Sequence, residues 1–149
     1  MTVLGSPPVF GTRPEGTACT PRRAAYAVIQ RGDTVAATRA RLRDGTSRHW
    51  LPGGRCEGGE SAEEAVLREI REELGRPARI THRIGDAVQY FFAGTEGRWY
   101  VMTATFFIAE LEDGDQTAAE YELLWVDPQA DGASFFHASH AWAARQCPQ

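Results

Sequence analysis

The segment from residue 61 to residue 77 constrains the fold more than any other part of this chain of 149 residues. Ser61 is a good N-cap for a helix, and Glu64, three residues later, completes a capping box. Gly75 and then Pro77 end the helical pattern. Between these signals one apolar stripe recurs at helical spacing, made of Val66, Leu67, Ile70 and Leu74. The sequence therefore predicts an amphipathic helix over 62–74 that packs one face against a core.

Strand-like runs lie on both sides of this helix. The predicted strands cover 22–30, 34–40, 49–51, 87–92, 98–111 and 121–126, and a second helix covers 137–146. The first two strands form a hairpin around a turn at 31–33, and the runs 87–92 and 98–111 form another. This order predicts an α+β fold with a mixed sheet between helices.

The length of the chain suits a single domain, which we place at residues 22–149. Residues 1–21 are rich in Gly, Pro and Thr and show no periodicity. They predict a flexible N-terminal arm.

Composition argues against several classes of protein. Hydrophobic residues make up 42% and charged residues 24%, as in a globular domain, and the apolar runs are too short to cross a membrane. The net charge is −4 and all 16 basic residues are arginine, which argues against duplex nucleic acid as a partner. The first residues lack the pattern of a secretory signal. We therefore expect a cytoplasmic protein with neither a membrane nor duplex nucleic acid as its partner.

Cysteine and histidine give no metal motif. Cys19, Cys56 and Cys147 are an odd number at scattered positions without C-x-x-C spacing, so neither a disulfide framework nor a thiolate zinc site is expected. His137 and His140 lie three residues apart on the second predicted helix. Two polar positions on a terminal helix are a simpler interpretation of this pair than a metal site.

The predicted helix 62–74 carries an unusual concentration of negative charge. At about 100° per residue, Glu69, Glu72 and Glu73 point within an arc of roughly 100° beside the apolar stripe. Like charges in neighbouring turns and near a helix C-terminus cost stability. A hard divalent cation such as Mg²⁺ explains the cluster, because this ion prefers oxygen ligands and bridges carboxylates to substrate phosphates. The glycines that precede the helix allow close approach of the backbone to a ligand. The glycine-rich loop and the acidic helix together predict a diphosphate site that works through bound metal ions.

Residues 54–76 resemble the signature of the Nudix hydrolases. That signature reads Gly, five residues, Glu, seven residues, then Arg-Glu-apolar-any-Glu-Glu-any-Gly-apolar. Its fixed positions are matched by Gly54, Glu60, Arg68, Glu69, Ile70, Glu72, Glu73 and Gly75. Arg76 departs from the pattern, since the family usually has a bulky aliphatic residue there, and the change touches packing more than chemistry. The resemblance implies the Nudix-type α/β/α sandwich.

The resemblance also implies roles for these residues. The metal ligands would be Gly53 through its carbonyl, with Glu69, Glu72 and Glu73 through their carboxylates. Arg68 would orient Glu69, and Glu60 would brace the loop that contains Gly54. The cofactor would be Mg²⁺, for which Mn²⁺ can substitute.

The family often draws one more glutamate from outside the signature, as a metal ligand or as the general base. Glu120, just before the strand 121–126, is the first candidate and Glu122 the second. The residues of the reaction itself would then come from Arg68, Glu72, Glu73 and Glu120. The sequence does not choose the base among them.

Substrate contacts are expected outside the signature. Arg39, Arg41 and Arg55 flank the predicted site and could clamp phosphates in a bidentate manner, as could Arg48. Tyr90 is the main aromatic candidate for stacking on a nucleobase, and Trp50 and Trp99 are further candidates. The alternative interpretation is that each of these arginines is simply exposed to solvent and that each aromatic residue belongs to the core.

We expect a Mg²⁺-dependent pyrophosphohydrolase that attacks a diphosphate bond with a metal-activated water. Its substrate would be a nucleoside diphosphate linked to another moiety, or a nucleoside triphosphate. The alternative is a Nudix-fold module that binds nucleotides as a sensor without turnover. The resemblance is also compatible with a homodimer.

Overall fold

The computed structural model describes residues 5–146. Its elements in chain order are β1 (Val9–Phe10), β2 (Thr20–Val28), β3 (Gln30–Arg31), β4 (Thr34–Arg41), β5 (Ser47–Trp50), β6 (Gly53–Arg55), α1 (Ala62–Leu74), β7 (Ala78–Ala93), β8 (Arg98–Leu111), β9 (Leu124–Val126), the 3₁₀ turn η1 (Gly132–Ser134) and α2 (Ala138–Ala144). Within the described residues, no helix is long and apolar enough to cross a membrane. Cys19 and Cys56 are free thiols, and Cys147 lies outside the described residues.

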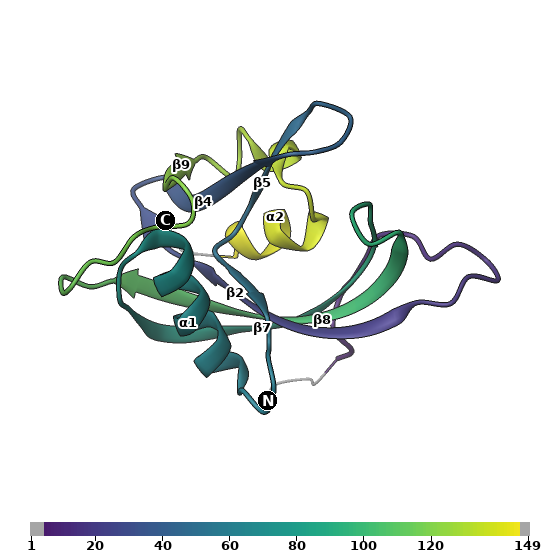
Figure 1. The fold of residues 1–149 in the computed structure, drawn as a ribbon, viewed down its shortest axis with the longest axis horizontal. Helices are drawn as coiled ribbons and strands as arrows, with labels where there is room; N and C mark the ends of the chain where they lie inside the picture. Colours follow the sequence, from purple (N-terminus) through teal and green to yellow (C-terminus); the bar gives the residue numbers. More distant parts are fainter. Residues whose placement is uncertain (1–4, 147–149) are drawn as a thin grey trace.

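The large sheet has the strand order β1-β7-β8-β2-β6 (Figure 1). β7 and β8 form a long antiparallel hairpin, as the sequence predicted. β2 runs parallel to β8 along its whole length, from Thr20 opposite Tyr100 to Val28 opposite Ile108. β1 adds parallel to β7, and β6 adds antiparallel to β2. The predicted mixed sheet is therefore confirmed.

A smaller sheet is built around β4. This strand pairs antiparallel with β3, β5 and β9. The predicted turn after the first strand is confirmed, and Gly32 supplies the positive φ of 59° that the tight turn requires.

Alternate residues of β2 face two separate cores, because side chains in a strand point to opposite faces in turn. One set, Ala25 and Ala27, packs against the apolar face of α1 together with Ile29 just after the strand. The other set packs on the side of α2: Ala24, Tyr26 and Val28. The two helices therefore lie on opposite faces of the large sheet (Figure 1). The α/β/α arrangement expected from the sequence is thus confirmed.

Several element boundaries differ from the sequence-based expectation. β7 begins at Ala78, nine residues before the predicted start at 87, because β8 offers a continuous partner up to Leu111. β9 keeps only the second half of the predicted strand 121–126, since the first half contacts the end of α1 instead. α2 covers 138–144 of the predicted 137–146.

The segment expected to form the N-terminal arm contributes to the large sheet in two places. Val9 and Phe10 form β1, which pairs with Val88 and Gln89. Thr20 and Pro21 belong to β2. Phe10 also packs against the ring of Trp142 in α2, with 5.8 Å between ring centroids. Residues 1–4 of the arm lie outside the described residues.

Candidate active site

Helix α1 carries the acidic cluster, and its ends form as predicted. The Ser61 side chain accepts the Glu64 amide, the Glu64 side chain accepts the Ser61 amide, and Gly75 ends the helix in the left-handed conformation. The buried face consists of Ala65, Val66, Ile70 and Leu74. This packing fixes the rotation of α1, so that the face beside the core presents its carboxylates toward the loop that precedes the helix.

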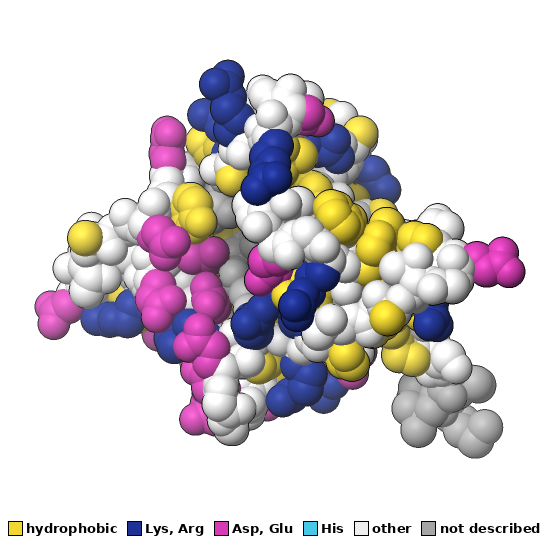
Figure 2. All heavy atoms as spheres, turned by 45° about the vertical axis from the view of Figure 1, so that its right-hand side comes forward, with side chains coloured by type: hydrophobic (Ala, Val, Ile, Leu, Met, Phe, Trp, Pro, Cys, Tyr) yellow, Lys and Arg dark blue, Asp and Glu magenta, His cyan; other side chains and the backbone are white. Residues whose placement is uncertain are grey.

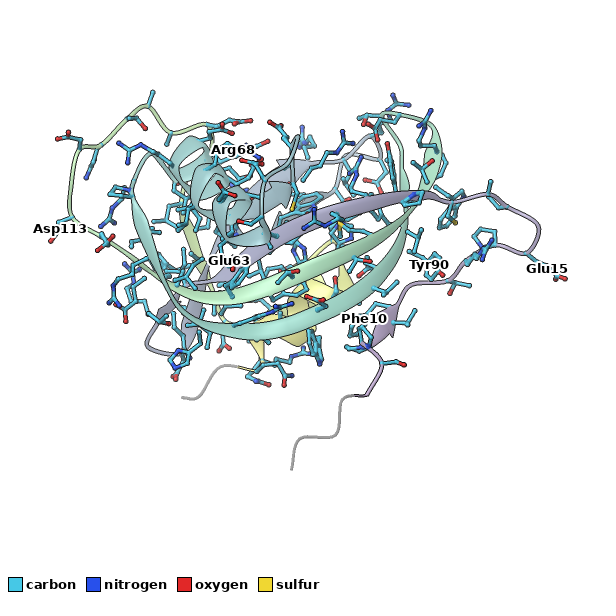
Figure 3. The ribbon with its side chains drawn as sticks, turned by 90° about the horizontal axis from the view of Figure 1, so that it is seen from below. Phe10, Glu15, Glu63, Arg68, Tyr90 and Asp113 are labelled. Carbon is cyan, nitrogen blue, oxygen red and sulfur yellow. The ribbon has the colours of Figure 1, made fainter. Side chains whose placement is uncertain are left out.

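Arg68 organises the site through several hydrogen bonds. Its Nε donates to Glu60 at 2.7 Å, and its Nη1 donates to Glu69 at 3.0 Å and to Glu72 at 3.2 Å. Its Nη2 donates to Glu60 and to the carbonyl oxygen of Arg55. Figure 3 shows Arg68 on the outer side of α1. One guanidinium thus ties the glycine-rich loop to two of the clustered carboxylates.

Glu60, which the resemblance expects to brace the loop, accepts hydrogen bonds from Arg68 and from the Glu57 amide. Its hydrogen bonds from Arg68, together with one from the Glu57 amide, lower the pKa of Glu60 to about 2. The carboxylate is therefore charged across the physiological range. Gly54 lies directly against Glu69, since a Cβ at that position would lie 2.9 Å from the carboxyl carbon of Glu69.

Glu73 is the most buried member of the acidic cluster. Its Oε1 accepts the backbone N–H of Gly53 at 2.9 Å, across 20 positions of sequence. Burial raises the pKa of Glu73 to about 8; the Gly53 hydrogen bond opposes this rise, and the charges of Glu69 and Glu120 add to it. Burial also raises the pKa of Glu69, against the opposing effect of Arg68. Both carboxylates therefore lie where a nearby cation would strongly favour the charged form.

The loop before β9 caps the C-terminal end of α1. The last carbonyl groups of a helix have no partners within it. Here the backbone N–H of Glu120 donates to the carbonyl of Glu72, and that of Tyr121 donates to the carbonyl of Glu73, each at 3.0 Å. Thr117 donates in the same way to the carbonyl of Gly75 at 2.9 Å. These contacts bring Glu120 to the acidic cluster, where its charge acts on Glu73.

The donor set has the chemistry that Mg²⁺ requires. Glu69, Glu72 and Glu73 offer hard carboxylate oxygens, and burial of two of them without full ionic pairing gives a cation a favourable place. Among residues 5–146, no three His, Cys, Asp or Glu side chains are arranged to hold an ion as they stand. Arg68 engages one oxygen each of Glu69 and Glu72, and the Gly53 amide engages one oxygen of Glu73. The residue types and their position fit a divalent cation.

A cleft runs from Glu73 to an aromatic chamber. A narrow part of about 210 Å³ is lined by Tyr26, Thr38, Ala40, Trp50, Gly53, Glu73 and Tyr121. It shares Tyr26, Ala40 and Trp50 with a larger part of about 580 Å³, whose wall includes Phe91, Phe92 and Phe136. Trp50 and Phe136 lie nearly parallel, with 5.1 Å between ring centroids. The cleft as a whole thus connects the aromatic rings of the chamber with the carboxylate of Glu73.

The structure brings only some of the predicted substrate contacts to this cleft. Arg41 lines the aromatic chamber, and Arg55 lines a separate hollow at the edge of β2. Arg39 is exposed on β4 opposite His49 and lines none of the described hollows. Tyr90 is half-buried on β7, and Figure 3 shows it far from Arg68. The candidate aromatic residue that does line the cleft is Trp50.

Three other residues that the sequence analysis singled out lie away from the cleft or support the fold. Arg48 donates to the carbonyl oxygens of Ala133 and Phe135, which is a structural role. Trp99 packs against Phe92 at the end of the β7–β8 hairpin. Arg76 contacts the carbonyl of Glu112 rather than the core.

Sequence reasoning missed Tyr26, Tyr121 and Phe136. Tyr26 and Tyr121 line the narrow part of the cleft with Glu73, and Phe136 forms the stack with Trp50. Burial, and next the charge of Glu73, raise the pKa of Tyr26, which therefore stays a neutral hydroxyl. Only the sequence position of Tyr121, directly after Glu120, gave a signal that could have identified one of the three.

His137 and His140 are both buried, at 3% and 0% exposure. The Leu51 amide donates to Nδ1 of His140 at 3.1 Å, and the ring of His140 packs against Tyr26. His137 packs against Phe91 and Phe136. Both rings are thus packed among aromatic side chains, and His137 is the N-cap residue of α2 rather than a residue within the helix.

The fold and the site together can be compared with known proteins. A family model described as the NUDIX domain matches residues 20–144. This chain belongs to the NUDIX family. A structure of a NUDIX hydrolase from Nitrosomonas europaea covers 85% of this chain and 87% of its own, with a TM-score of 0.65 at 20% identity. That likeness shows the fold.

Two curated relatives carry different names. A Bacillus subtilis protein named "Putative 8-oxo-dGTP diphosphatase" is 38% identical over 86 residues, which are 52% of this chain and 49% of that protein. The ADP-ribose pyrophosphatase of Methanocaldococcus jannaschii is 37% identical over 78 residues, 50% of this chain and 44% of that protein. The match spans about half the length of these curated relatives.

Proposed function

We propose that this NUDIX protein is a Mg²⁺-dependent pyrophosphohydrolase of nucleotides. The observation that carries the proposal is the carboxylate cluster on α1, tied to the Gly53 amide at one end of an aromatic cleft. Membership of the NUDIX family and the names of the curated relatives support the same chemistry. The scissile diphosphate would lie at Glu73, and the nucleoside would lie in the chamber beside Trp50.

Glu69, Glu72 and Glu73 would hold the cation, with the carbonyl of Gly53 as a further ligand. A cation held there would activate a water molecule for attack and offset the charge of the leaving phosphate. Arg68 keeps Glu69 in place through its 3.0 Å hydrogen bond and is itself held by Glu60. This arrangement makes Arg68 a positioning residue.

The proton of the attacking water needs an acceptor near the cluster. Glu120 is the first candidate, because its backbone is fixed to α1 and its carboxylate lies close enough to act on the pKa of Glu73. Glu72 and Glu73 are the other candidates. Tyr121 and Tyr26 line the narrow part of the cleft beside Glu73.

The aromatic chamber favours a nucleoside as one part of the substrate. Trp50 and Phe136 form a flat apolar surface, and Arg41 beside them offers a cation for a phosphate or for stacking. A nucleoside diphosphate linked to another moiety and a nucleoside triphosphate both satisfy this description. The different substrates in the names of the relatives keep both classes in the proposal.

The test is turnover of a nucleotide panel with Mg²⁺ or Mn²⁺, with and without a chelator, followed by identification of product masses. Glu69→Gln and Glu73→Gln should each lower kcat/KM more than about a hundredfold, because each removes an anionic ligand. Glu63→Gln is the matched control, since Glu63 is exposed in the first turn of the same helix.

Full activity in Glu69→Gln or Glu73→Gln would refute the assignment of metal ligands. Absence of turnover across the panel, with nucleotide binding still measurable by thermal shift, would favour the sensor alternative instead. An intact set of carboxylates supports the enzyme, because a sensor has no need of all three.

A further inference from the structure

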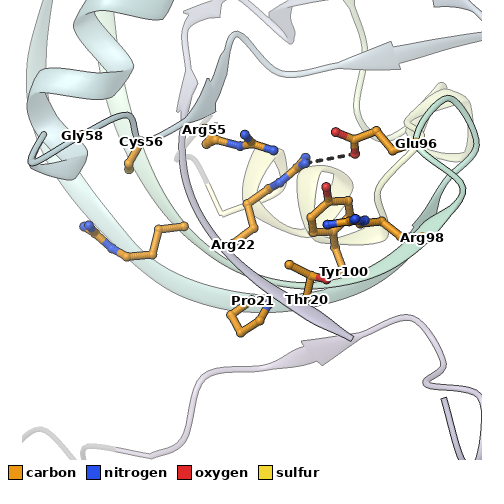
Figure 4. Close-up of a pocket in the computed structure, with 10 residues that line it drawn as sticks. Thr20, Pro21, Arg22, Arg55, Cys56, Gly58, Glu96, Arg98 and Tyr100 are labelled. Carbon is orange, nitrogen blue, oxygen red and sulfur yellow. Dashed lines mark hydrogen bonds and ion pairs between the residues drawn. The ribbon is translucent and has the colours of Figure 1, made fainter. Parts of the chain in front are cut away.

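A second hollow lies beside the candidate active site, at the start of β2 (Figure 4). It has a volume of about 670 Å³ and lies between the start of β2, the glycine-rich loop before α1 and the start of β8. Four arginines line it, together with a single acidic residue, Glu96. We call it the arginine pocket, and its arginines are Arg22, Arg23, Arg55 and Arg98. This concentration of positive charge stands out in a chain whose net charge is −4.

Arg22 is held rigidly in the wall of the arginine pocket. Its guanidinium lies 3.8 Å from the ring centroid of Tyr100, and its Nη2 pairs with Glu96 at 3.3 Å. The side chain is only 17% exposed. Its Nε is buried and has no hydrogen-bond partner among the described residues. A guanidinium that is already held in place is suited to an oxyanion, because binding costs little further ordering of the side chain.

The other three arginines add charge that nothing in the described chain neutralises by direct contact. The side chains of Arg23, Arg55 and Arg98 are exposed and form no ion pair or hydrogen bond there. Some arginines elsewhere do pair, as Arg79 does with Glu110 and Arg83 with Asp86. Because Glu96 offsets only one of the four guanidinium charges, three positive charges remain in a concave site.

We propose that the arginine pocket binds a phosphate group. A phosphate dianion matches several guanidinium groups at once, since each can donate two parallel hydrogen bonds to its oxygens. A carboxylate would balance only one of the three charges. Figure 4 shows the side chains of Arg22, Arg55 and Arg98 gathered around Glu96, where such a group would compete for them.

The arginine pocket adjoins the aromatic chamber on one side and the glycine-rich loop held by Arg68 on the other. Arg22 also lines the aromatic chamber, and the backbone of Arg55 receives a hydrogen bond from Arg68. Figure 2 shows acidic and arginine side chains gathered side by side on one face. The bound phosphate is therefore either a group of the substrate remote from the scissile bond or free phosphate. Only the first of these sources rests on the function proposed above.

Binding is tested by calorimetric titration of the protein with inorganic phosphate and with pyrophosphate, in chelator so that no divalent cation takes part. Arg98→Gln should weaken phosphate binding roughly tenfold, the loss of one charge-assisted contact. Glu96→Gln should tighten it, because it removes the competing carboxylate. Arg13→Gln is the matched control, since it removes an exposed arginine outside the pocket.

Equal affinity in the Arg98→Gln and Arg13→Gln proteins would overturn the proposal, as would weaker binding in Glu96→Gln. Steady-state kinetics then identify the source of the phosphate. A raised KM for nucleotide in Arg98→Gln, at unchanged kcat, would assign the pocket to the substrate. An unchanged KM together with weakened phosphate binding would assign it to free phosphate. The calorimetric result does not depend on turnover, so the pocket and the proposed function can fail separately.

Discussion

The buried histidine pair makes the stability of this protein sensitive to acid in a way that one substitution can isolate. Burial, and next the charge of Arg22, lower the pKa of His137 to about 3. Burial also lowers the pKa of His140, and His137 adds to the effect. Both rings are therefore neutral in the folded state, whereas each takes up a proton near pH 6.5 when the chain unfolds.

The size of the effect follows from these values. A folded pKa below the unfolded pKa means that the stability contribution of the neutral ring is complete above pH 6.5 and is lost as the pH falls toward 3. For His137 alone, protonation of the unfolded chain at pH 5 lowers the free energy of unfolding by about 2 kcal/mol. His140 acts in the same direction. A loss of this size is a large fraction of the stability of an ordinary domain.

The assay is urea unfolding at pH 7 and pH 5, at one ionic strength and without metal, for the wild type and for His137→Phe. Phenylalanine suits the site because the ring of His137 packs against Phe91 and Phe136 and its Nδ1 has no hydrogen-bond partner among the described residues. The free energy of unfolding should fall by about 2 kcal/mol less in His137→Phe than in the wild type between these two pH values. His82→Phe is the matched control, because His82 is exposed.

Glu73 acts in the opposite direction and explains why the comparison needs the variant. Its raised pKa of about 8 means that its protonation stabilises the fold as the pH falls from 8 toward 4.5. This contribution is common to both proteins and cancels in their difference. An identical pH dependence in the wild type and His137→Phe would refute the view that a neutral, buried His137 is part of the folded state.

Two further predictions concern the ends of α1. Ser61→Ala removes the side chain that accepts the Glu64 amide and should lower the free energy of unfolding by about 1 kcal/mol, measured by urea unfolding; no change would mean that the capping box does not stabilise this helix. Gly75→Ala should cost about 1–2 kcal/mol or more, because φ is 71° and a Cβ would overlap the carbonyl oxygen of Thr117. The melting temperature of Gly75→Ala tests this, and a value equal to the wild type would contradict the observed contact between α1 and the loop before β9.

The features that could be predicted from the sequence are local ones. Helix periodicity relates positions three and four apart by geometry alone, so the capping box at Ser61, the buried stripe and the shared face of Glu69 and Glu73 follow from spacing. Turn chemistry likewise marks the hairpin at Gly32. The position of the acidic cluster on a helix after a glycine-rich loop was therefore determined before any tertiary contact was known.

The tertiary structure decided which distant residues meet. Glu73 reaches the Gly53 amide because β6 pairs with β2 and α1 packs on the same sheet, and this depends on strand register rather than on local spacing. The same is true of Trp50 and Phe136, whose stack in the cleft joins β5 to the segment before α2. For this reason Tyr90, a reasonable candidate by composition, lies away from the cleft.

The arginine pocket shows most clearly the difference between what local sequence determines and what the tertiary structure decides. The sequence shows that Arg22 and Glu96 are present, but they are 74 positions apart and nothing local relates them. Parallel pairing of β2 with β8 places Thr20 opposite Tyr100, and this register carries Arg22 onto the Tyr100 ring and beside Glu96. Local sequence determines elements and their faces because backbone geometry is periodic. Only the folded chain determines a site whose members come from different strands, because each pairing is chosen by the packing of the whole core.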